Sequence, residues 1–263
     1  MNKPEEIINR MNDLGKQGEP FVFLIDFLGQ KPKIFPLKES SGEILWHIPD
    51  FSNVVRFQTE PSQKIWNTNP VSFEKYKTGF DQIQQHINNG DTYLLNFTQP
   101  TLIETNLSLE EIFHLSSAPY KIYLKNQFVC FSPETFVKID NGKIYSFPMK
   151  GTIDAGIDNA EELILKDTKE VAEHNTIVDL IRNDLSLISE NVKVEKFRYL
   201  SHIQTNQKNL WQVSSKISGD LPDDFAKKIG DIIFAMLPAG SISGAPKKKT
   251  LEIIEKSENY DRG

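Results

Sequence analysis

The sequence predicts an α+β protein with a mainly antiparallel sheet, and two patterns support this fold class. Strand-type and helix-type runs come in blocks along the chain, whereas a parallel sheet needs strand and helix in regular alternation. The strand-type runs are short and rich in β-branched and aromatic residues, while the helix-type runs repeat apolar residues every three or four positions. With 263 residues, of which 38% are hydrophobic and 25% charged, the chain is long enough to bury a sizeable core.

The chain divides into a short, β-rich N-terminal segment over residues 1–70 and a larger domain over residues 71–263 that carries the candidate chemistry. In the first segment we expect one helix followed by strands at 21–27, 34–35 and 44–48.

The larger domain should begin with an amphipathic helix over 73–89, because its apolar residues recur at helical spacing and Asn89-Gly90 can close it. A long helix over 168–188 carries an apolar stripe formed by Ile177, Val178, Ile181 and Leu185. The other expected strands lie at 93–97, 122–124, 128–131, 135–139, 143–147, 192–199 and 211–217, and the other helices at 107–116, 223–236 and 248–257.

Charge and composition argue against two kinds of partner. Lys plus Arg number 30 and Asp plus Glu 36, which gives a net charge of −6 and no broad positive field for nucleic acid. No segment approaches the ~20 apolar residues that span a bilayer, and the polar start is unlike an export signal, so we expect a cytoplasmic protein with no membrane partner. A single cysteine, Cys130, agrees with a reducing compartment.

The first candidate site is a predicted hairpin that carries Glu134 before its turn and Lys150 after it. A two-residue turn at 141–142 would set Glu134 opposite Met149 and leave Glu134 and Lys150 on opposite faces. A three-residue loop at 140–142 sets Glu134 opposite Pro148 and brings both charged residues to one face, about 7–8 Å apart. We prefer the second register, because an activated lysine amine is a nucleophile and a nearby carboxylic acid protonates a leaving oxygen. A surface ion pair is the alternative.

The long helix offers a second candidate. Glu173 lies one turn before the apolar stripe, where its carboxylate could serve as a hard oxygen ligand for Mg²⁺; a solvated glutamate is the alternative. Farther along the helix, Asp179, Arg182, Asn183 and Asp184 are interpreted as helix-surface and C-terminal capping groups.

The third candidate is the loop over 237–247, whose small residues and glycines allow backbone amides to approach an anion. A following helix adds the positive end of its dipole, and Lys247 adds a full charge. The loop therefore suits a carboxylate or phosphate, but it lacks the ending of a P-loop and the preceding strand of a dinucleotide fingerprint. A plain loop before a helix is the alternative.

Taken in order, these segments resemble the chorismate-utilising enzyme family over roughly residues 73–263. The matching motifs are Ser132-Pro133-Glu134, Pro148-Met149-Lys150-Gly151-Thr152, Glu173-His174 with Ile177 to Leu185, and Gly240-Ser241-Ile242-Ser243-Gly244-Ala245-Pro246-Lys247. The resemblance implies an anthranilate synthase component I-like fold, with large, mainly antiparallel sheets and helices packed outside.

Because Lys150 stands before Gly151-Thr152, the chain resembles the aminodeoxychorismate synthases of 4-aminobenzoate and folate biosynthesis, which carry Lys at this position, whereas anthranilate synthases carry Ala. The resemblance implies that the Lys150 amine adds to the chorismate ring, that Glu134 protonates the departing 4-hydroxyl and that ammonia then displaces the lysine. It further implies that Glu173 holds Mg²⁺. The implied substrate-positioning residues are Gly151, Thr152, Gly240, Ser241 and Lys247.

The resemblance also implies a separate glutamine amidotransferase subunit as the ammonia source, because Cys130 lies in an apolar strand and is expected to be inert core. The sequence departs from the family at Trp211, which replaces a histidine, and at Leu94, which stands where the synthases commonly have Gln and isochorismate synthases a water-activating Lys. The family normally continues past the position of Gly263, so a C-terminally incomplete catalytic domain is expected. Anthranilate synthase component I and a non-catalytic, truncated chorismate-family domain remain the alternatives.

Overall fold

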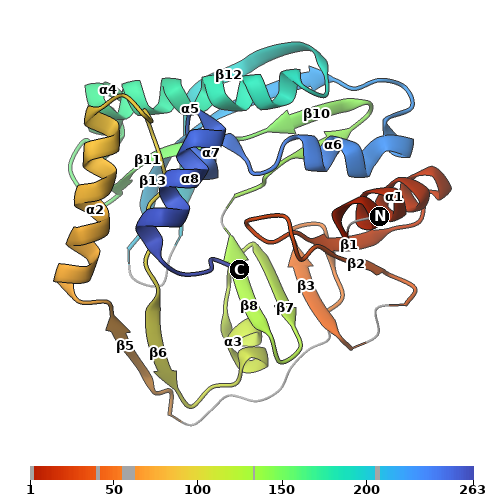
Figure 1. Ribbon diagram of the computed structural model, residues 1–263, viewed down its shortest axis with the longest axis horizontal. Helices are drawn as coiled ribbons and strands as arrows, with labels where there is room; N and C mark the ends of the chain where they lie inside the picture. The colour runs from red at the N-terminus through yellow and green to blue at the C-terminus, as the bar shows by residue number, and fades with distance from the viewer. Residues whose placement is uncertain (1–2, 40–41, 55–62, 133, 205–207) are drawn as a thin grey trace.

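The computed structural model describes residues 3–39, 42–54, 63–132, 134–204 and 208–263 (Figure 1). Its helices are α1 (Lys3–Gln17), α2 (Phe73–Asn88), α3 (Leu109–Leu115), α4 (Ala160–Lys166), α5 (Thr168–Ser186), the 3₁₀ helix η1 (Phe225–Lys228), α6 (Ile229–Ala235), α7 (Gly240–Ser243) and α8 (Lys247–Glu258). Its strands are β1 (Phe21–Leu24), β2 (Lys33–Pro36), β3 (Ile44–Ile48), β4 (Phe51–Ser52), β5 (Trp66–Pro70), β6 (Thr101–Thr105), β7 (Tyr120–Leu124), β8 (Phe128–Ser132), β9 (Lys138–Asp140), β10 (Lys143–Ser146), β11 (Met149–Asp154), β12 (Glu190–Ile203) and β13 (Leu210–Asp220).

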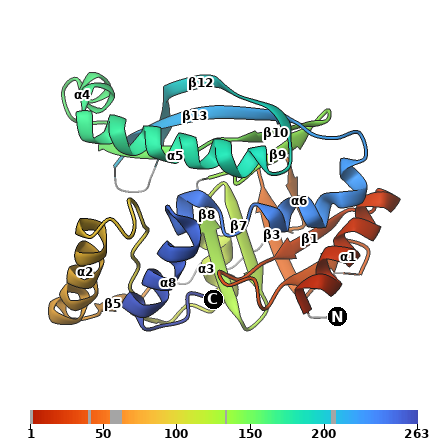
Figure 2. The same ribbon diagram turned by 45° about the horizontal axis from the view of Figure 1, so that its top comes forward.

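The largest sheet is built around β13. Along one edge β13 pairs with β12, and along the other it pairs first with β11 and then with β10, which in turn pairs with β9. Every pair in this sheet is antiparallel. Helix α5 lies across one face of the sheet, and α6 and α8 lie beyond α5 on that same side of the sheet (Figure 2). The sequence prediction of an α+β fold with mainly antiparallel sheets is therefore confirmed.

The apolar stripe of α5 supplies the main hydrophobic core. Ile177, Val178, Ile181 and Leu185 are buried there, against residues of the sheet that include Ile217. Since burying one such side chain contributes about 1.5–3 kcal/mol relative to exposing it, this stripe is a large part of what fixes α5 on the sheet. The helix thereby holds its first turns, which include Glu173, beside β11.

A second sheet contains strands from both predicted parts of the chain. Its order is β4-β3-β7-β8, and β3, from residues 1–70, pairs with β7, from residues 71–263. Separate two-stranded sheets are formed by β1 with β2 and by β5 with β6. Within the described residues, no helix combines the length and the apolar character needed to cross a membrane.

Two expectations about the strands near the candidate site are wrong. Lys143 pairs with Asp140, so the hairpin has a two-residue turn, and the preferred three-residue loop does not form. Asn141 and Gly142 both have positive φ, at 50° and 73°, as a tight type I′ turn requires. The strand expected at 93–97 is not formed either, because its pairing is limited to one isolated bridge between Leu94 and Ala245. Strands β5, β6 and β11 and helix α4 were not among the predicted elements.

Candidate active site

Residues from four distant stretches of chain line a cavity of about 290 Å³. They are Leu94, Leu95 and Asn96, then Glu134 with Met149 and Lys150, then Ile177 of α5, and finally Ser241, Ile242 and Gly244. The cavity therefore brings together parts of all three motifs found in the sequence. A larger hollow of about 500 Å³ lies against β1, β3, β7 and β8, but the described residues that line it are mainly apolar and include none of the predicted site residues.

Lys150 reaches this cavity because β11 is irregular where it begins. The pairing of β11 with β13 shifts register between Met149 and Thr152, and Gly151 within the shift has a φ of +92°. A Cβ atom at Gly151 would also lie 2.9 Å from the Glu170 Oε2 atom. Glycine is needed here for the left-handed backbone, whereas the Glu170 side chain could move aside.

The ammonium of Lys150 is paired with the predicted metal ligand. Lys150 Nζ lies 2.9 Å from Glu173 Oε2, and Lys169 Nζ lies 3.6 Å from Glu173 Oε1. The hydrogen bond from Lys150 holds the pKa of Glu173 below its usual range, although partial burial opposes this shift. Glu173 is therefore an ionised carboxylate beside the candidate nucleophile, with its side chain 26% exposed.

Glu134 lines the same cavity and is held in a local turn. Its backbone N–H donates to Ser132 Oγ at 3.0 Å, and the Ser132 hydroxyl donates back to the Glu134 carbonyl at 3.1 Å. Burial of the carboxyl raises the pKa of Glu134, and a hydrogen bond from the Met149 backbone amide partly offsets the rise. A carboxyl group whose pKa is raised keeps its proton to a higher pH, which is the property a general acid needs.

The small-residue loop is fixed at both ends by one buried carboxylate, that of Asp184. Asp184 Oδ2 accepts a hydrogen bond from the Gly240 backbone N–H at 2.8 Å, and Oδ1 lies 2.7 Å from Lys247 Nζ. Asp184 is 8% exposed, so its interpretation as a helix-surface or capping group is wrong. The sequence did hold a signal: three residues after Ile181, Asp184 falls in the apolar stripe of α5.

The opposite side of the loop is held by the irregular segment that begins at Tyr93. The Tyr93 N–H donates to the Ala245 carbonyl at 2.9 Å, and the Ala245 N–H donates to the Leu94 carbonyl at 3.2 Å. A Cβ atom at Gly244, whose φ is +81°, would lie 1.8 Å from the Leu94 oxygen. Only glycine permits this approach, which places Ser241 and Ile242 at the cavity wall.

A buried histidine supports the backbone near Lys150. His174 is fully buried, and its Nε2 lies 2.7 Å from Ser215 Oγ. That hydroxyl also accepts from the Arg198 N–H, and the Ser215 N–H donates to the Pro148 carbonyl at 3.0 Å. Burial lowers the pKa of His174, which favours its neutral form.

The structure thus separates the predicted site residues into groups. Lys150, Glu134 and Ser241 line the cavity, and Glu173 forms an ion pair with Lys150. Gly240 and Lys247 lie near the two ends of the small-residue loop, and both bind the carboxylate of Asp184. Thr152 lines a neighbouring hollow together with Glu170. The sequence reasoning missed Asn96 and Asp184.

Two other residues singled out in the sequence lie apart from this cavity. Trp211 contacts the ring of His202 edge-on, with 4.9 Å between centroids. Cys130 is exposed, so the expectation that it belongs to the core is wrong.

Comparison with known proteins identifies the family of this chain. The family model described as chorismate binding enzyme matches residues 41–263. The protein therefore belongs to the chorismate-binding enzyme family, as the motifs indicated. A relative named "Uncharacterized PabA-like protein" from Haemophilus influenzae is 46% identical over 98% of this chain and 79% of its own length.

More distant relatives carry two different activity names at nearly the same identity. Aminodeoxychorismate synthase component 1 from Bacillus subtilis is 28% identical over 94% of this chain and 54% of its own length. Anthranilate synthase component 1 from Acetivibrio thermocellus is 29% identical over 86% of this chain and 48% of its own length. A solved structure of a putative 2,3-dihydroxybenzoate-specific isochorismate synthase from Bacillus anthracis shares the fold, with a TM-score of 0.66 and 20% identity over 98% of this chain and 71% of that one.

Proposed function

We propose that this protein aminates chorismate at the 4-position to give 4-amino-4-deoxychorismate, through a covalent intermediate on Lys150. The observation that carries the proposal is that Lys150 and Glu134 line one cavity together with the small-residue loop, in a chain of the chorismate-binding family. A nucleophilic amine and a carboxyl group with a raised pKa are the two groups that displacement of a ring hydroxyl by an amine requires.

The proposed reaction consists of two allylic displacements. The neutral Lys150 amine forms a C–N bond to the ring, and the 4-hydroxyl departs as water with the proton of Glu134. Ammonia then forms a bond at the 4-position, and the bond to the Lys150 nitrogen breaks. Since an ammonium has no free electron pair, Lys150 must first give up a proton to the solvent, which also breaks its ion pair with Glu173.

Substrate positioning is assigned to the two glycine-containing segments. Ser241 is in the cavity wall, and Gly240 is held beside it by Asp184. Gly151 and Thr152 shape the strand that carries Lys150. The Lys247 ammonium would attract a substrate carboxylate while it keeps its hydrogen bond to Asp184.

Glu134→Gln is expected to slow amination about a hundredfold and to change its pH dependence. Because the folded-state pKa of Glu134 is raised, the acid is available below that pKa and is lost as pH rises through it. The wild-type kcat/KM should therefore fall on the alkaline side, and the variant should lack this limb. Asp140→Asn, at an exposed acid of the same hairpin, serves as the control. An unchanged alkaline limb in Glu134→Gln would remove Glu134 from the role of acid.

Magnesium remains part of the proposal, with Glu173 as its protein ligand. No group of three or more His, Cys, Asp or Glu side chains that could hold a metal is found in the described part of the chain. One ionised carboxylate still fits Mg²⁺, which often takes one or two carboxylates and completes its shell with water and substrate oxygens. When bound, Mg²⁺ would offset the negative charge of a substrate carboxylate.

Glu173→Gln is expected to weaken Mg²⁺ activation at least about tenfold, because a neutral amide is a poorer ligand for a hard cation. The measurement is a Mg²⁺ titration of activity, repeated by calorimetry on the free protein. Asp179→Asn, an exposed acid on the same helix, should leave the titration unchanged. A wild-type Mg²⁺ titration in Glu173→Gln would exclude Glu173 as the metal ligand.

A separate glutamine amidotransferase subunit is proposed as the source of ammonia. A glutaminase needs an activated cysteine with a histidine partner. In the second sheet Cys130 is in register with Ile122 and Trp46, whereas His47 pairs with Lys121, one residue along, so Cys130 and His47 project from opposite faces. This arrangement gives Cys130 no histidine partner from β3, which supports an external ammonia source.

The proposal is tested by intact-mass spectrometry of the chain after incubation with chorismate and Mg²⁺ in the absence of ammonia. The expected result is a mass increase equal to chorismate minus water, which peptide mapping assigns to Lys150. A saturating incubation that leaves the mass unchanged overturns the covalent mechanism. Release of pyruvate once ammonia is added would instead identify anthranilate formation, because 4-amino-4-deoxychorismate keeps its enolpyruvyl group.

A further inference from the structure

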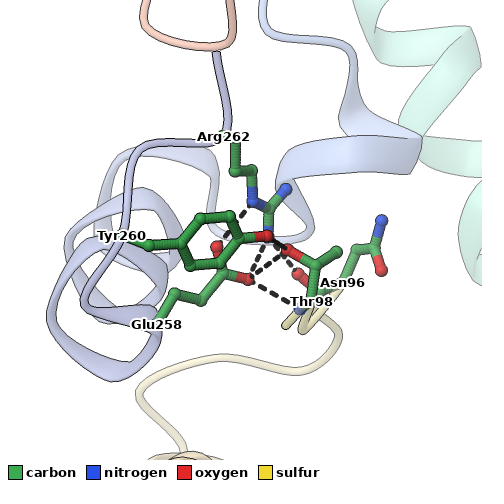
Figure 3. Close-up of polar contacts among 5 residues, drawn as sticks. All are labelled: Asn96, Thr98, Glu258, Tyr260 and Arg262. Atoms are coloured by element: carbon green, nitrogen blue, oxygen red, sulfur yellow. Dashed lines mark hydrogen bonds and ion pairs between the residues drawn. The ribbon is translucent and has the colours of Figure 1, made fainter. Parts of the chain in front are cut away.

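A buried ion pair at the C-terminal end of α8 lies just beyond the candidate cavity. Glu258 and Arg262 have side chains that are 2% and 11% exposed. Arg262 Nε donates to Glu258 Oε2 at 2.7 Å, and its second terminal nitrogen donates to Oε1 at 2.5 Å (Figure 3). The two side chains therefore form a bidentate pair, in which two parallel hydrogen bonds restrict the relative orientation of the side chains.

Both members of this pair also hold the backbone that follows Leu95. Arg262 donates to the Asn96 carbonyl at 2.5 Å, and Glu258 Oε1 accepts from the Thr98 N–H at 2.7 Å. The Thr98 hydroxyl donates to the same Glu258 oxygen at 3.0 Å and accepts from the Tyr260 hydroxyl at 2.5 Å. The Asn96 side chain points away from the pair (Figure 3), and Asn96 is one of the residues that line the cavity.

The segment held in this way has little support from regular structure. Residues 95–98 belong to no helix or strand, and Leu94 makes a single bridge to Ala245. Buried or partly buried backbone groups need hydrogen-bond partners, and here two of them find partners on side chains about 160 residues away in sequence. The position of Asn96 in the cavity wall is thus coupled to α8.

The same helix also contacts the residues that hold the small-residue loop. Lys247, its first residue, is paired with Asp184, and Thr250 Oγ1 lies 2.8 Å from Thr92 Oγ1. Four residues after the end of α8, Arg262 lies over the ring of Phe27, with 4.3 Å between the guanidinium carbon and the ring centroid. Helix α8 and the residues that follow it therefore contact both the small-residue loop and the segment that contains Asn96.

We propose that Glu258 and Arg262 are positioning residues, which set the Leu94–Asn96 wall of the cavity and so determine its fit to the substrate. The identity of that substrate, chorismate, rests on the proposed function. A buried ion pair usually adds little net stability compared with an apolar pair of the same size. Here the pair fixes the position of the backbone at Asn96. A planar guanidinium binds a carboxylate and a carbonyl at the same time, and a lysine ammonium cannot reproduce that geometry.

The test uses Arg262→Lys, which keeps the charge opposite Glu258 but not the fork. Hydrogen–deuterium exchange is measured without ligand, and we expect peptides over residues 93–98 to exchange at least tenfold faster while peptides from β13 are unchanged. Chorismate affinity, titrated by calorimetry in a Lys150→Ala background to avoid covalent reaction, should fall at least tenfold. Lys31→Ala is the matched control, because Lys31 pairs with the neighbouring Asp261 at the exposed surface and should change neither quantity.

The two measurements separate this proposal from the proposed function. Wild-type exchange at residues 93–98 in Arg262→Lys overturns the proposal, and so does faster exchange with unchanged chorismate affinity. If the starting protein does not bind chorismate, the proposed function fails, and the exchange measurement still decides whether the pair sets the wall. Should Arg262→Lys also loosen β13, Thr98→Val replaces it, since it removes only the hydroxyl contacts to Glu258 and Tyr260. At least threefold faster exchange of residues 93–98 is then expected, and unchanged exchange overturns the proposal.

Discussion

Lys150→Ala is expected to lower the rate of chorismate amination at least about a thousandfold, because the covalent route is lost. The variant should also show no mass increase on incubation with chorismate. The fold should survive, since Lys150 is 37% exposed and Glu173 keeps Lys169 as a second cation at 3.6 Å. Measurement of 4-amino-4-deoxychorismate by liquid chromatography, with ammonia supplied directly, gives the rate independently of any partner subunit.

The matched control is Lys169→Ala, which removes the other cation beside Glu173. Lys169 is 79% exposed and does not line the cavity, so this variant should retain nearly the wild-type rate. An equal loss in both variants would mean that the charge around Glu173, and not a nucleophile, is what matters. Full activity in Lys150→Ala would contradict the covalent mechanism, whatever the control showed.

Glu134 and Lys150 line one cavity, although the hairpin register from which we expected them to lie close together is wrong. Asn141-Gly142 is a strong local signal for a two-residue turn, and the structure has that turn. The three-residue loop would place the two charged side chains on one face, but that advantage does not decide the turn. In the structure β9 begins only at Lys138, after Glu134, and a break between β10 and β11 precedes Lys150. Strand alternation therefore does not govern how these two residues meet.

The cavity wall formed by residues 94–96 could not be predicted from local sequence patterns. Residues 93–97 have the apolar pattern of a strand, yet their neighbours in space are the loop at Ala245 and the side chain of Arg262. Hydrogen bonds that join residues more than 150 positions apart leave no trace in the local periodicity. By contrast, the amphipathic helices α2 and α5 were predictable, because their apolar spacing reflects the core that each helix contacts.

Asp184 shows a limit of a different kind. Its place in the apolar stripe of α5 was visible in the sequence, but an aspartate near the end of a helix is more often exposed, and its partners Gly240 and Lys247 lie far along the chain. A charged residue within a buried stripe requires a partner that removes the cost of its burial. That rule would have pointed to a distant cation or backbone amide, although not to which one.

Asp184→Asn is expected to lower the free energy of unfolding by about 2–3 kcal/mol, because it leaves the partly buried Lys247 ammonium without its counter-charge. Asparagine keeps an oxygen for the Gly240 N–H, so the loss measures mainly the ion pair. The corresponding fall in melting temperature is roughly 4–12 °C for a chain of this size. Urea denaturation followed by circular dichroism provides the free energy, and thermal melts provide the temperature.

The double variant Asp184→Asn with Lys247→Met decides what the pair is for. Removing both charges leaves no unpaired ion, so most of the lost stability should return, and a double-mutant cycle measures the coupling. If Lys247 also binds a substrate carboxylate, the double variant will regain stability while its chorismate affinity stays at least about tenfold low. Recovery of both quantities would restrict Lys247 to holding the loop, whereas additive losses in the two single variants would contradict the ion pair itself.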